Sequence, residues 1–258
     1  MLTMGSLFDG IGGFPLAAVR HGIVPLWASE IEPFPIEVTK HHFPGMIHVG
    51  DITKLNGAEL PPVDIICGGS PCQDLSVAGA RAGLAGERSG LFMEQVRIVK
   101  EMRDADIRDG QPALFVRPRW LCWENVPGAF SSGEPKGEDF RVVLEEICRI
   151  KCDSVSVPRP YSGRWESAGR ILLGADFSLA WRVLDAQYWG VAQRRRRIFL
   201  VADFGGRTAP AILFERRRVP RYSPQGEGTR ESAPAYAGIG IADTSGTAPN
   251  EADDDPDG

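Results

Sequence analysis

The sequence lacks an apolar run long enough to cross a bilayer, and it does not begin with the cationic and then apolar segment that directs secretion. Cysteine is scarce, with five residues at irregular spacing, which excludes a small secreted scaffold built on disulfides. No further Cys or His pair completes a zinc set around Cys148 and Cys152. These absences predict a soluble, cytoplasmic protein with no membrane partner and no bound metal.

An overall excess of positive charge is also lacking, since the formal net charge is -5. The final residues, 251–258, hold five acids and no base, however, so the rest of the chain is close to neutral. Arginines cluster within this neutral body at 194–197 and 216–218. Because local patches decide the affinity for phosphate, a nucleic-acid partner stays open.

The chain opens with a predicted strand, a glycine turn and a helix. An apolar strand over residues 2–8 precedes Asp9-Gly10-Ile11-Gly12-Gly13, and a helix is expected over 14–21. Glycines let the backbone approach a ligand closely, and the N-terminus of the helix offers unpaired N–H groups. The turn matches neither the P-loop nor the Gly-x-Gly-x-x-Gly dinucleotide fingerprint.

Acidic residues stand at the ends of the next two predicted strands. Strand 23–28 ends at Ser29-Glu30, a helix over 33–42 follows, and strand 46–49 ends at Gly50-Asp51. A carboxylate in such a place can accept hydrogen bonds from both hydroxyl groups of a ribose. Taken singly, Glu30 and Asp51 fit N-caps of the following helices as well. Their recurrence at successive strand ends favours a ligand site.

A cysteine follows the fourth predicted strand. A buried strand over 63–67 stops at Gly68-Gly69, and Ser70-Pro71-Cys72-Gln73 comes next. Ligands bind beyond the carboxyl ends of parallel strands, so the Cys72 thiol is placed for chemistry, whereas Cys67, inside the strand, is structural. The glycine- and arginine-rich residues 74–90 are expected to form a lid over substrate, or else a plain connector.

The remaining pattern predicts an α/β fold with a mostly parallel, twisted sheet, an antiparallel edge hairpin and helices on both faces. Residues 1–205 form its main domain, 206–225 begin a linker or recognition region, and 226–258 are a disordered acidic tail. The later elements are expected as helices over 91–103 and 138–150, a strand over 120–123 ending at Glu124-Asn125, an irregular insertion over 153–174, and two antiparallel strands over 179–184 and 197–201.

Seven short motifs stand in order along residues 2–202. They are Phe8-x-Gly10-x-Gly12-Gly13, Ser29-Glu30, Gly50-Asp51-Ile52, Pro71-Cys72-Gln73, Arg88-Ser89-Gly90-Leu91-Phe92, Glu124-Asn125-Val126 and Gln193-x-Arg195-x-Arg197. The Pro-Cys-Gln, Glu-Asn-Val and Gln-x-Arg-x-Arg motifs are specific in this combination, although each alone is not. Together the seven motifs resemble those of the C5-cytosine DNA methyltransferases.

The resemblance implies a Rossmann-like class I methyltransferase fold and methyl transfer from S-adenosylmethionine to carbon 5 of cytosine in DNA. Carbon 5 is a weak nucleophile, so the family first adds a thiolate to carbon 6 of a flipped-out base. Cys72 matches that thiolate, and Gln73 completes its motif. Glu124 matches the acid that serves the ring nitrogen N3, and Asn125 holds its loop in shape.

The arginine motif has an implied role in contacts with the substrate. Arg195 and Arg197 match family arginines that contact the cytosine O2, the catalytic loop and backbone phosphate, a task that suits a planar cation with several donors. Arg194 and Arg196 are better explained as solvent-exposed residues of a basic edge with no specific contact.

The same resemblance implies that S-adenosylmethionine lies over the first three strand ends. Phe8 packs against the adenine, Glu30 binds the ribose hydroxyl groups, and Asp51 accepts a hydrogen bond from the adenine amino group in this scheme. The remaining implied cofactor positions are Gly10, Ile11, Gly12, Gly13, Ile31, Ile52, Pro71 and Leu91, of which the last two close the pocket.

In the family, a variable target-recognition region and two further motifs follow Gln-x-Arg-x-Arg. Only 57 residues follow Val201, and none matches the late motifs, so we expect a catalytic domain truncated before them. Ala192 stands where the family generally has proline, which affects one turn. The implied partners are double-stranded DNA, a second chain that supplies the recognition region, and a cognate restriction enzyme.

Two other functions stay open at this point. The first is the same methyl transfer to cytosine in transfer RNA, because a close relative of the fold modifies transfer RNA. The second is a non-catalytic remnant that binds only cofactor or a partner.

Overall fold

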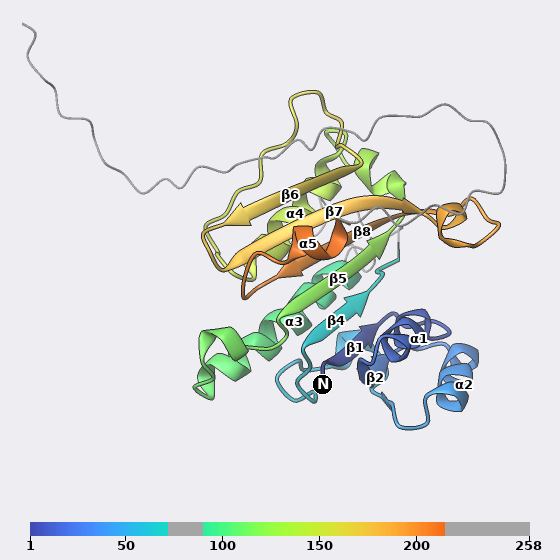
Figure 1. Cartoon of the computed structure of the whole chain (residues 1–258). Coiled ribbons are helices and arrows are strands. Elements are labelled where there is room, and N and C mark those ends of the chain that lie inside the picture. Colours follow the sequence, from blue (N-terminus) through green and yellow to red (C-terminus); the bar gives the residue numbers. More distant parts are fainter. Residues whose placement is uncertain (72–89, 215–258) are drawn as a thin grey trace, which may run out of the picture.

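The computed structural model describes residues 1–71 and 90–214, and in these residues it forms one eight-stranded sheet flanked by helices (Figure 1). The order of the strands is β3-β2-β1-β4-β5-β8-β7-β6. Their bounds are β1 Thr3–Leu7, β2 Val24–Ser29, β3 Ile47–His48, β4 Ile65–Gly68, β5 Trp120–Asn125, β6 Ala168–Leu173, β7 Phe177–Asp185 and β8 Arg196–Asp203.

Strands β1 to β5 pair in parallel, whereas β8 is antiparallel to β5 and the pairs β7·β8 and β6·β7 are antiparallel as well. The prediction of a mostly parallel α/β sheet with an antiparallel edge is confirmed. The edge has three strands instead of a hairpin. The prediction of an irregular insertion over 153–174 is therefore wrong for Ala168–Leu173, which form β6. Its short apolar run is hidden by polar neighbours, but Ile171 is fully buried, and Gly169 leaves room for the Trp181 ring across the strand pair.

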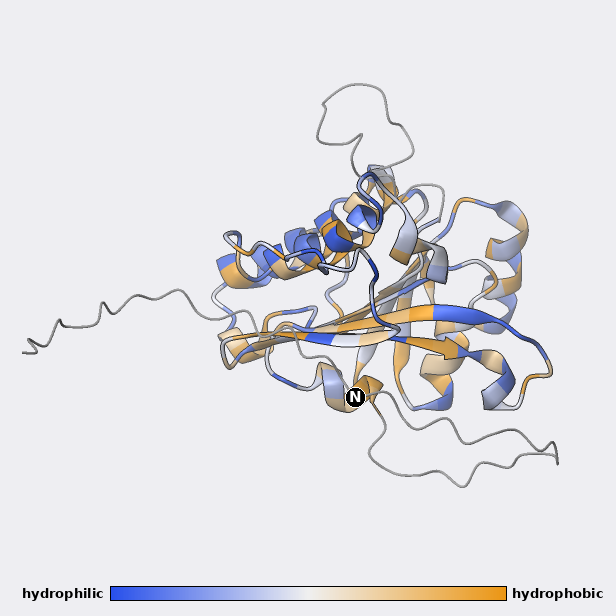
Figure 2. Cartoon of the chain, turned by 90° about the horizontal axis from the view of Figure 1, so that it is seen from above, coloured by the Kyte–Doolittle hydropathy of each residue, from blue (hydrophilic) through white to orange (hydrophobic). Residues whose placement is uncertain are grey.

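Helices cover both faces of the sheet, as predicted (Figure 2). Phe92 and Phe140, from α3 and α4, join the large core over one face. Ala18 of α1 and Leu213 of α5 pack against the other. In residues 1–71 and 90–214 we find no helix with the length and apolar character that a membrane span requires. The bounds are α1 Gly13–Arg20, α2 Pro33–His42, α3 Gly90–Arg108, α4 Glu138–Arg149 and α5 Ala209–Leu213.

Several elements differ from the expectation at their ends, and two of these differences have a clear consequence. Helix α3 continues to Arg108 instead of ending at Arg103, because the buried Asp106 carboxylate accepts hydrogen bonds from the backbone N–H and guanidinium of Arg117. Strand β5 includes Glu124 and Asn125, which were expected just beyond it. The longer strand carries the polar side chains on regular β backbone, which holds them more firmly than a loop.

The short helix α5 was not expected, because periodicity fades after Asp203. Ala209 and Leu213 are buried against Ala180 of β7 and Val201 of β8. Thr208 donates to the Asp203 carboxylate, which ties the start of this helix to the last strand. The boundary at residue 205 stays a prediction, and residues 215–258, with the proposed tail, lie outside the described residues.

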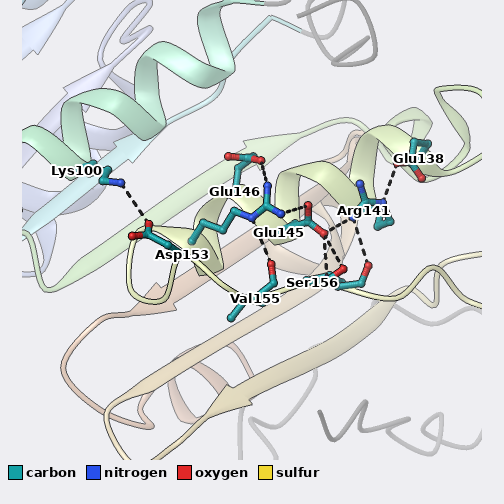
Figure 3. Close-up of polar contacts among 10 residues, drawn as sticks. Lys100, Glu138, Arg141, Glu145, Glu146, Asp153, Val155 and Ser156 are labelled. Atoms are coloured by element: carbon teal, nitrogen blue, oxygen red, sulfur yellow. Dashed lines mark hydrogen bonds and ion pairs between the residues drawn. The ribbon is translucent and has the colours of Figure 1, made fainter. Parts of the chain in front are cut away.

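Helix α4 is joined to the segment after it by a network of ion pairs around Glu145 (Figure 3). The Glu145 carboxylate is 2% exposed and pairs with Arg141 and, at 2.9 Å, with Arg149. Oε2 also accepts a hydrogen bond of 3.1 Å from the backbone N–H of Val157, and Arg149 Nε donates to the Val155 carbonyl at 3.2 Å. These bonds hold the chain that leads from α4 to β6.

The network makes a testable prediction for stability. Replacing Glu145 by Gln removes a buried charge that two arginines face, so we expect the free energy of unfolding to fall by about 2 to 3 kcal/mol in denaturant titrations at pH 7. The matched control is Glu37→Gln, which breaks an exposed 2.9 Å pair with Lys40 and should change stability by less than about 0.5 kcal/mol. Equal effects of the two substitutions would contradict the assignment.

The pH dependence has a defined sign. Burial alone raises the pKa of Glu145, but the Val157 hydrogen bond and the two arginines outweigh it and lower this pKa below the usual range. A carboxyl whose folded-state pKa is depressed stabilises the fold above its unfolded-state pKa and loses that contribution as pH falls. The stability difference between wild type and Glu145→Gln should therefore shrink on acidification below the ordinary glutamate pKa.

Candidate functional site

The candidate site lies at the carboxyl edge of the parallel strands, where the strand order reverses between β1 and β4. Strand β1 leads outward to β2 and β3, whereas β4 leads the other way to β5. Ligands of open α/β sheets bind in the crevice outside such a switch point. Phe8, Glu30, Asp51, Pro71 and Glu124 all lie at or just beyond the carboxyl ends of these strands.

Glu30 holds the glycine turn between β1 and α1. Gly10 N–H donates to Glu30 Oε2 at 2.8 Å, and the N–H groups of Ile31 and Glu32 donate to Oε1 at 2.8 and 3.0 Å. Gly10 and Gly12 have φ of 55° and 84°, the left-handed region that glycine adopts without strain. The acid at the second strand end thus contacts the motif at the first, so the structure brings these two predicted groups together.

The turn leaves room for a ligand. A Cβ built on Gly10, Gly13 or Gly50 would meet no atom within 4 Å, and Ile11 and Ile31 are exposed on either side. Phe8, half-buried after β1, has a φ of 54°, which is unusual for a large side chain. The open space lies over two successive strand ends and is bounded below by glycine backbone. A group the size of a nucleoside needs such a space in order to bind.

Asp51 has a local role in the structure. Its Oδ1 accepts from the N–H and hydroxyl of Thr53 at 3.0 and 2.8 Å and caps a 3-10 helix, Ile52–Lys54, whose first residue is buried. These hydrogen bonds lower the pKa of Asp51. The capping alternative is therefore confirmed for Asp51, and its other oxygen lies 3.4 Å from Lys54 Nζ.

Asp9 is a buried carboxyl that the sequence analysis treated only as a spacer between Phe8 and Gly10. It is 6% exposed, Ser6 Oγ donates to its Oδ1 at 2.5 Å, and Oδ2 has no hydrogen-bond partner among the described residues. Burial, helped by the nearby Glu30 charge and opposed by the Ser6 bond, raises the pKa of Asp9 to about 6. A polar residue in a glycine turn is the one signal that could have drawn attention to it.

The turn after β4 is fixed to the end of β5. Asn125 Nδ2 donates to the Ser70 carbonyl at 3.1 Å, and Trp123 Nε1 donates to Ser70 Oγ at 3.3 Å. Cys72 and Gln73, with all of the lid predicted over 74–90 except Gly90, lie outside the described residues, which stop at the exposed Pro71 and resume at Gly90. The residue two positions before Cys72 is nevertheless anchored, a role of Ser70 that the sequence analysis missed. Hydroxyls at a strand end give only a weak signal of such a contact.

Glu124 is paired with an arginine from the antiparallel edge. Arg197 Nε lies 2.9 Å from Glu124 Oε1, since β8 runs beside β5 with Glu124 opposite Phe199. A Cβ on Gly69 would come within 3.0 Å of Glu124 Oε2, so glycine at that position lets the carboxylate approach the turn before Cys72. The Gly69-Ser70 turn, the Glu-Asn-Val motif and the second arginine of Gln-x-Arg-x-Arg therefore converge.

Arg195 and Leu91 occupy less central places. The Arg195 side chain is exposed, and its backbone N–H donates to Asp185 Oδ1 at 3.0 Å. Leu91, in the first turn of α3, is half-buried and packs against the core. The structure thus brings Arg197 to Glu124 and leaves Arg195 at the rim. The hydrogen bond with Cys122 raises the pKa of the Cys67 thiol, and burial raises it further, so Cys67 is a structural cysteine, as expected.

Comparison with known proteins agrees with this geometry. The family model described as C-5 cytosine-specific DNA methylase matches residues 2–150. A protein of Escherichia phage P1 named DNA N-6-adenine-methyltransferase is 35% identical over 93% of this chain, and the match covers 34% of that protein. The type II methyltransferase M2.BsuMI of Bacillus subtilis is 30% identical over 77% of this chain and 41% of its own length.

Solved structures show the same fold. The Dnmt2 methyltransferase of S. pombe aligns with a TM-score of 0.54 and 16% identity, over 85% of this chain and 57% of that chain. This chain spans only about a third to two fifths of the curated relatives named above. The match to the family model nevertheless covers more than half of the sequence and includes the glycine turn, both strand-end acids and the Glu-Asn-Val motif. The chain belongs to the C-5 cytosine-specific DNA methylase family.

Proposed function

We propose that this chain carries the catalytic half of a DNA methyltransferase that transfers a methyl group to carbon 5 of cytosine. The observation that carries the proposal is the meeting of three motifs from three strands: the Ser70 turn before Cys72, Glu124 on β5 and Arg197 on β8. A thiol, a carboxyl and a cation together are what addition to a pyrimidine ring requires. The family assignment supports the same reaction.

In this mechanism Cys72 attacks carbon 6 as the thiolate, and the electron pair displaced from the C5–C6 bond makes carbon 5 nucleophilic. Charge pushed onto N3 is met by a proton from Glu124 Oε2, the oxygen that faces Gly69. Arg197 holds the other oxygen, Oε1, and so fixes the orientation of the carboxyl group. Asn125 keeps Ser70, two residues before Cys72, at the end of β5.

Because carbon 6 is stacked in duplex DNA, the base has to leave the helix first. Once carbon 5 carries the methyl group, loss of its proton to solvent and departure of the Cys72 thiolate from carbon 6 restore the double bond of the ring.

S-adenosylmethionine fits the open space over the glycine turn and would supply an electrophilic methyl group there. Glu30 keeps its carboxylate at this edge, where it can accept from ribose hydroxyls. Phe8 offers a half-buried ring for the adenine, and the exposed Ile11 and Ile31 can cover its faces. Asp51 can reach the adenine amino group with the oxygen that Thr53 does not occupy.

The names of the relatives suggest the other partners. We propose that a second chain supplies a target-recognition region, and that the complex works in the cytoplasm beside a cognate restriction enzyme, since one relative is named a type II methyltransferase. A pull-down of the 258-residue chain with candidate polypeptides that carry the late motifs, followed by a methylation assay, tests this directly. Full activity of the isolated chain on DNA would contradict the need for a second chain.

The name of the phage P1 relative raises adenine N6 as a second acceptor. Transfer to an exocyclic amine needs no attack on a ring carbon, so it gives no role to Cys72 or to a proton at N3. The nucleosides formed from S-adenosylmethionine with DNA or with transfer RNA, separated by mass spectrometry, distinguish the three substrates. We expect 5-methylcytosine in DNA. N6-methyladenine alone, or a product confined to transfer RNA, would refute the proposal.

The nucleophile is tested by substitution. Replacing Cys72 by Ser should lower methyl transfer to DNA by at least about a hundredfold, because the alcohol is not ionised at neutral pH, while cofactor affinity changes little. Cys152→Ser is the matched control, since this exposed thiol lies beyond the end of α4, and it should keep full transfer. If Cys72→Ser retained turnover, the covalent mechanism would be refuted.

The cofactor assignment is tested by calorimetry. Replacing Glu30 by Ala should weaken S-adenosylmethionine binding about tenfold or more, because charge-assisted hydrogen bonds to the ribose and the hold on Gly10 are both lost. Glu32→Ala, which changes an exposed acid two residues away, should leave the dissociation constant nearly unchanged. An unaltered affinity in Glu30→Ala would count against the ribose assignment.

A further inference from the structure

The connection between β7 and β8 exposes two adjacent aromatic rings. It begins with a 3-10 helix, Ala186–Trp189, in which Tyr188 is 75% and Trp189 56% exposed. Single exposed apolar residues need no explanation, but two large exposed rings at consecutive positions of a short loop are uncommon. Residues 186–197 also contain four arginines and no acid, and Arg194 to Arg196 are exposed. Exposed rings among cations are the composition of surfaces that bind nucleic acid.

The loop stands at the rim of the candidate site. It leaves β7 at Asp185 and enters β8 at Arg196, and these two residues are opposite each other in the strand pair. Asn125, the last residue of β5, is opposite Ile198, so the base of the loop lies beside the carboxyl end of β5. In Figure 1 the loop, in orange, projects beyond that end. Arg197, at its root, contacts Glu124.

The base of the loop is held by Asp185. Its Oδ1 accepts from the backbone N–H groups of Arg195 and Gln187 at 3.0 and 3.3 Å, and its Oδ2 accepts from Gln187 Nε2 at 2.7 Å. The Ala186 N–H donates to the Arg195 carbonyl at 3.1 Å. The rings therefore stand on a loop whose two ends are joined, and a surface held in this way loses little conformational freedom when it binds.

We propose that Tyr188 and Trp189 form a stacking surface for DNA beside the base that reacts. The inference rests on the proposed function, because a base that leaves the helix exposes the faces of its neighbours, and an aromatic ring can cover such a face. Arg194 and Arg196 lie within the same loop and supply phosphate contacts, which give affinity without sequence preference. The rings then favour DNA with an unstacked position over an intact duplex.

Fluorescence anisotropy with two labelled duplexes, one intact and one with a single abasic site, tests the surface in the 258-residue chain. Tyr188→Ala together with Trp189→Ala should weaken binding to the abasic duplex at least about fivefold, since stacking on each base has a substantial effect on affinity. Tyr188→Phe with Trp189→Phe keeps both rings and should bind within about twofold of wild type. Phe115→Ala removes a 64% exposed ring before β5, at the opposite edge of the sheet, and should change nothing.

Intrinsic fluorescence gives a second measurement that phosphate contacts alone would not change. All six tryptophans lie in the described residues, and Trp189 alone among them is exposed. DNA should therefore protect the emission of the wild-type protein from quenching by acrylamide, and this protection should vanish in Trp189→Phe.

The outcomes separate the two proposals. If wild type binds the abasic duplex and the double alanine variant binds it equally well, the stacking surface is refuted and the proposed function stands. If Trp189 stays fully accessible to acrylamide in the complex, the surface is refuted as well. If wild type binds neither duplex and transfers no methyl group to DNA even with the late motifs supplied on a second chain, the proposed function fails and the inference fails with it.

Discussion

The hydrogen bond from Asn125 Nδ2 to the Ser70 carbonyl is the contact on which the account of the site depends. It joins the end of β5 to Ser70, two residues before Cys72, and Gly69 beside it lies close to the Glu124 carboxylate. The Glu124 pair with Arg197 adds the antiparallel edge to the same point. The three strands are far apart in the sequence. Their polar residues meet only because the sheet order places β4, β5 and β8 side by side.

The type of pairing in the sheet, though not the order of the strands, follows from features that the sequence carries locally. Apolar strands separated by helices predict parallel pairing, and the strand-end glycines and acids indicate which edge is functional. These predictions are confirmed for the α/β class, the parallel strands and the antiparallel edge. Strand β6 could not be found in this way, because its pairing with β7 depends on the fit of Trp181 over Gly169, a contact between residues that no local pattern connects.

The candidate site was predictable to a similar degree. Glu30, Glu124 and Arg197 were identified from the motifs. The structure brings Glu30 to Gly10 and Arg197 to Glu124. The motifs gave no reason to prefer Arg197 over Arg195, since that choice depends on where β8 begins: Arg197 lies in the strand, beside the end of β5, whereas Arg195 lies in the loop before it. Ser70 and Asp185 were missed because their contacts involve backbone atoms and join segments that are distant in the sequence or lie across a loop. The roles assigned to the site residues stay predictions of the family chemistry.

The central claim is that Cys72 adds to carbon 6 of a cytosine held beside Glu124. Duplex DNA with 5-fluorocytosine at a methylated position tests it most directly, because fluorine at carbon 5 blocks the final elimination and traps the adduct. Mass spectrometry after incubation with S-adenosylmethionine, with the late motifs supplied on a second chain, should find the oligonucleotide linked to the peptide that contains Cys72. A complex that transfers methyl groups to DNA yet traps no adduct, or links it to another residue, would contradict the account.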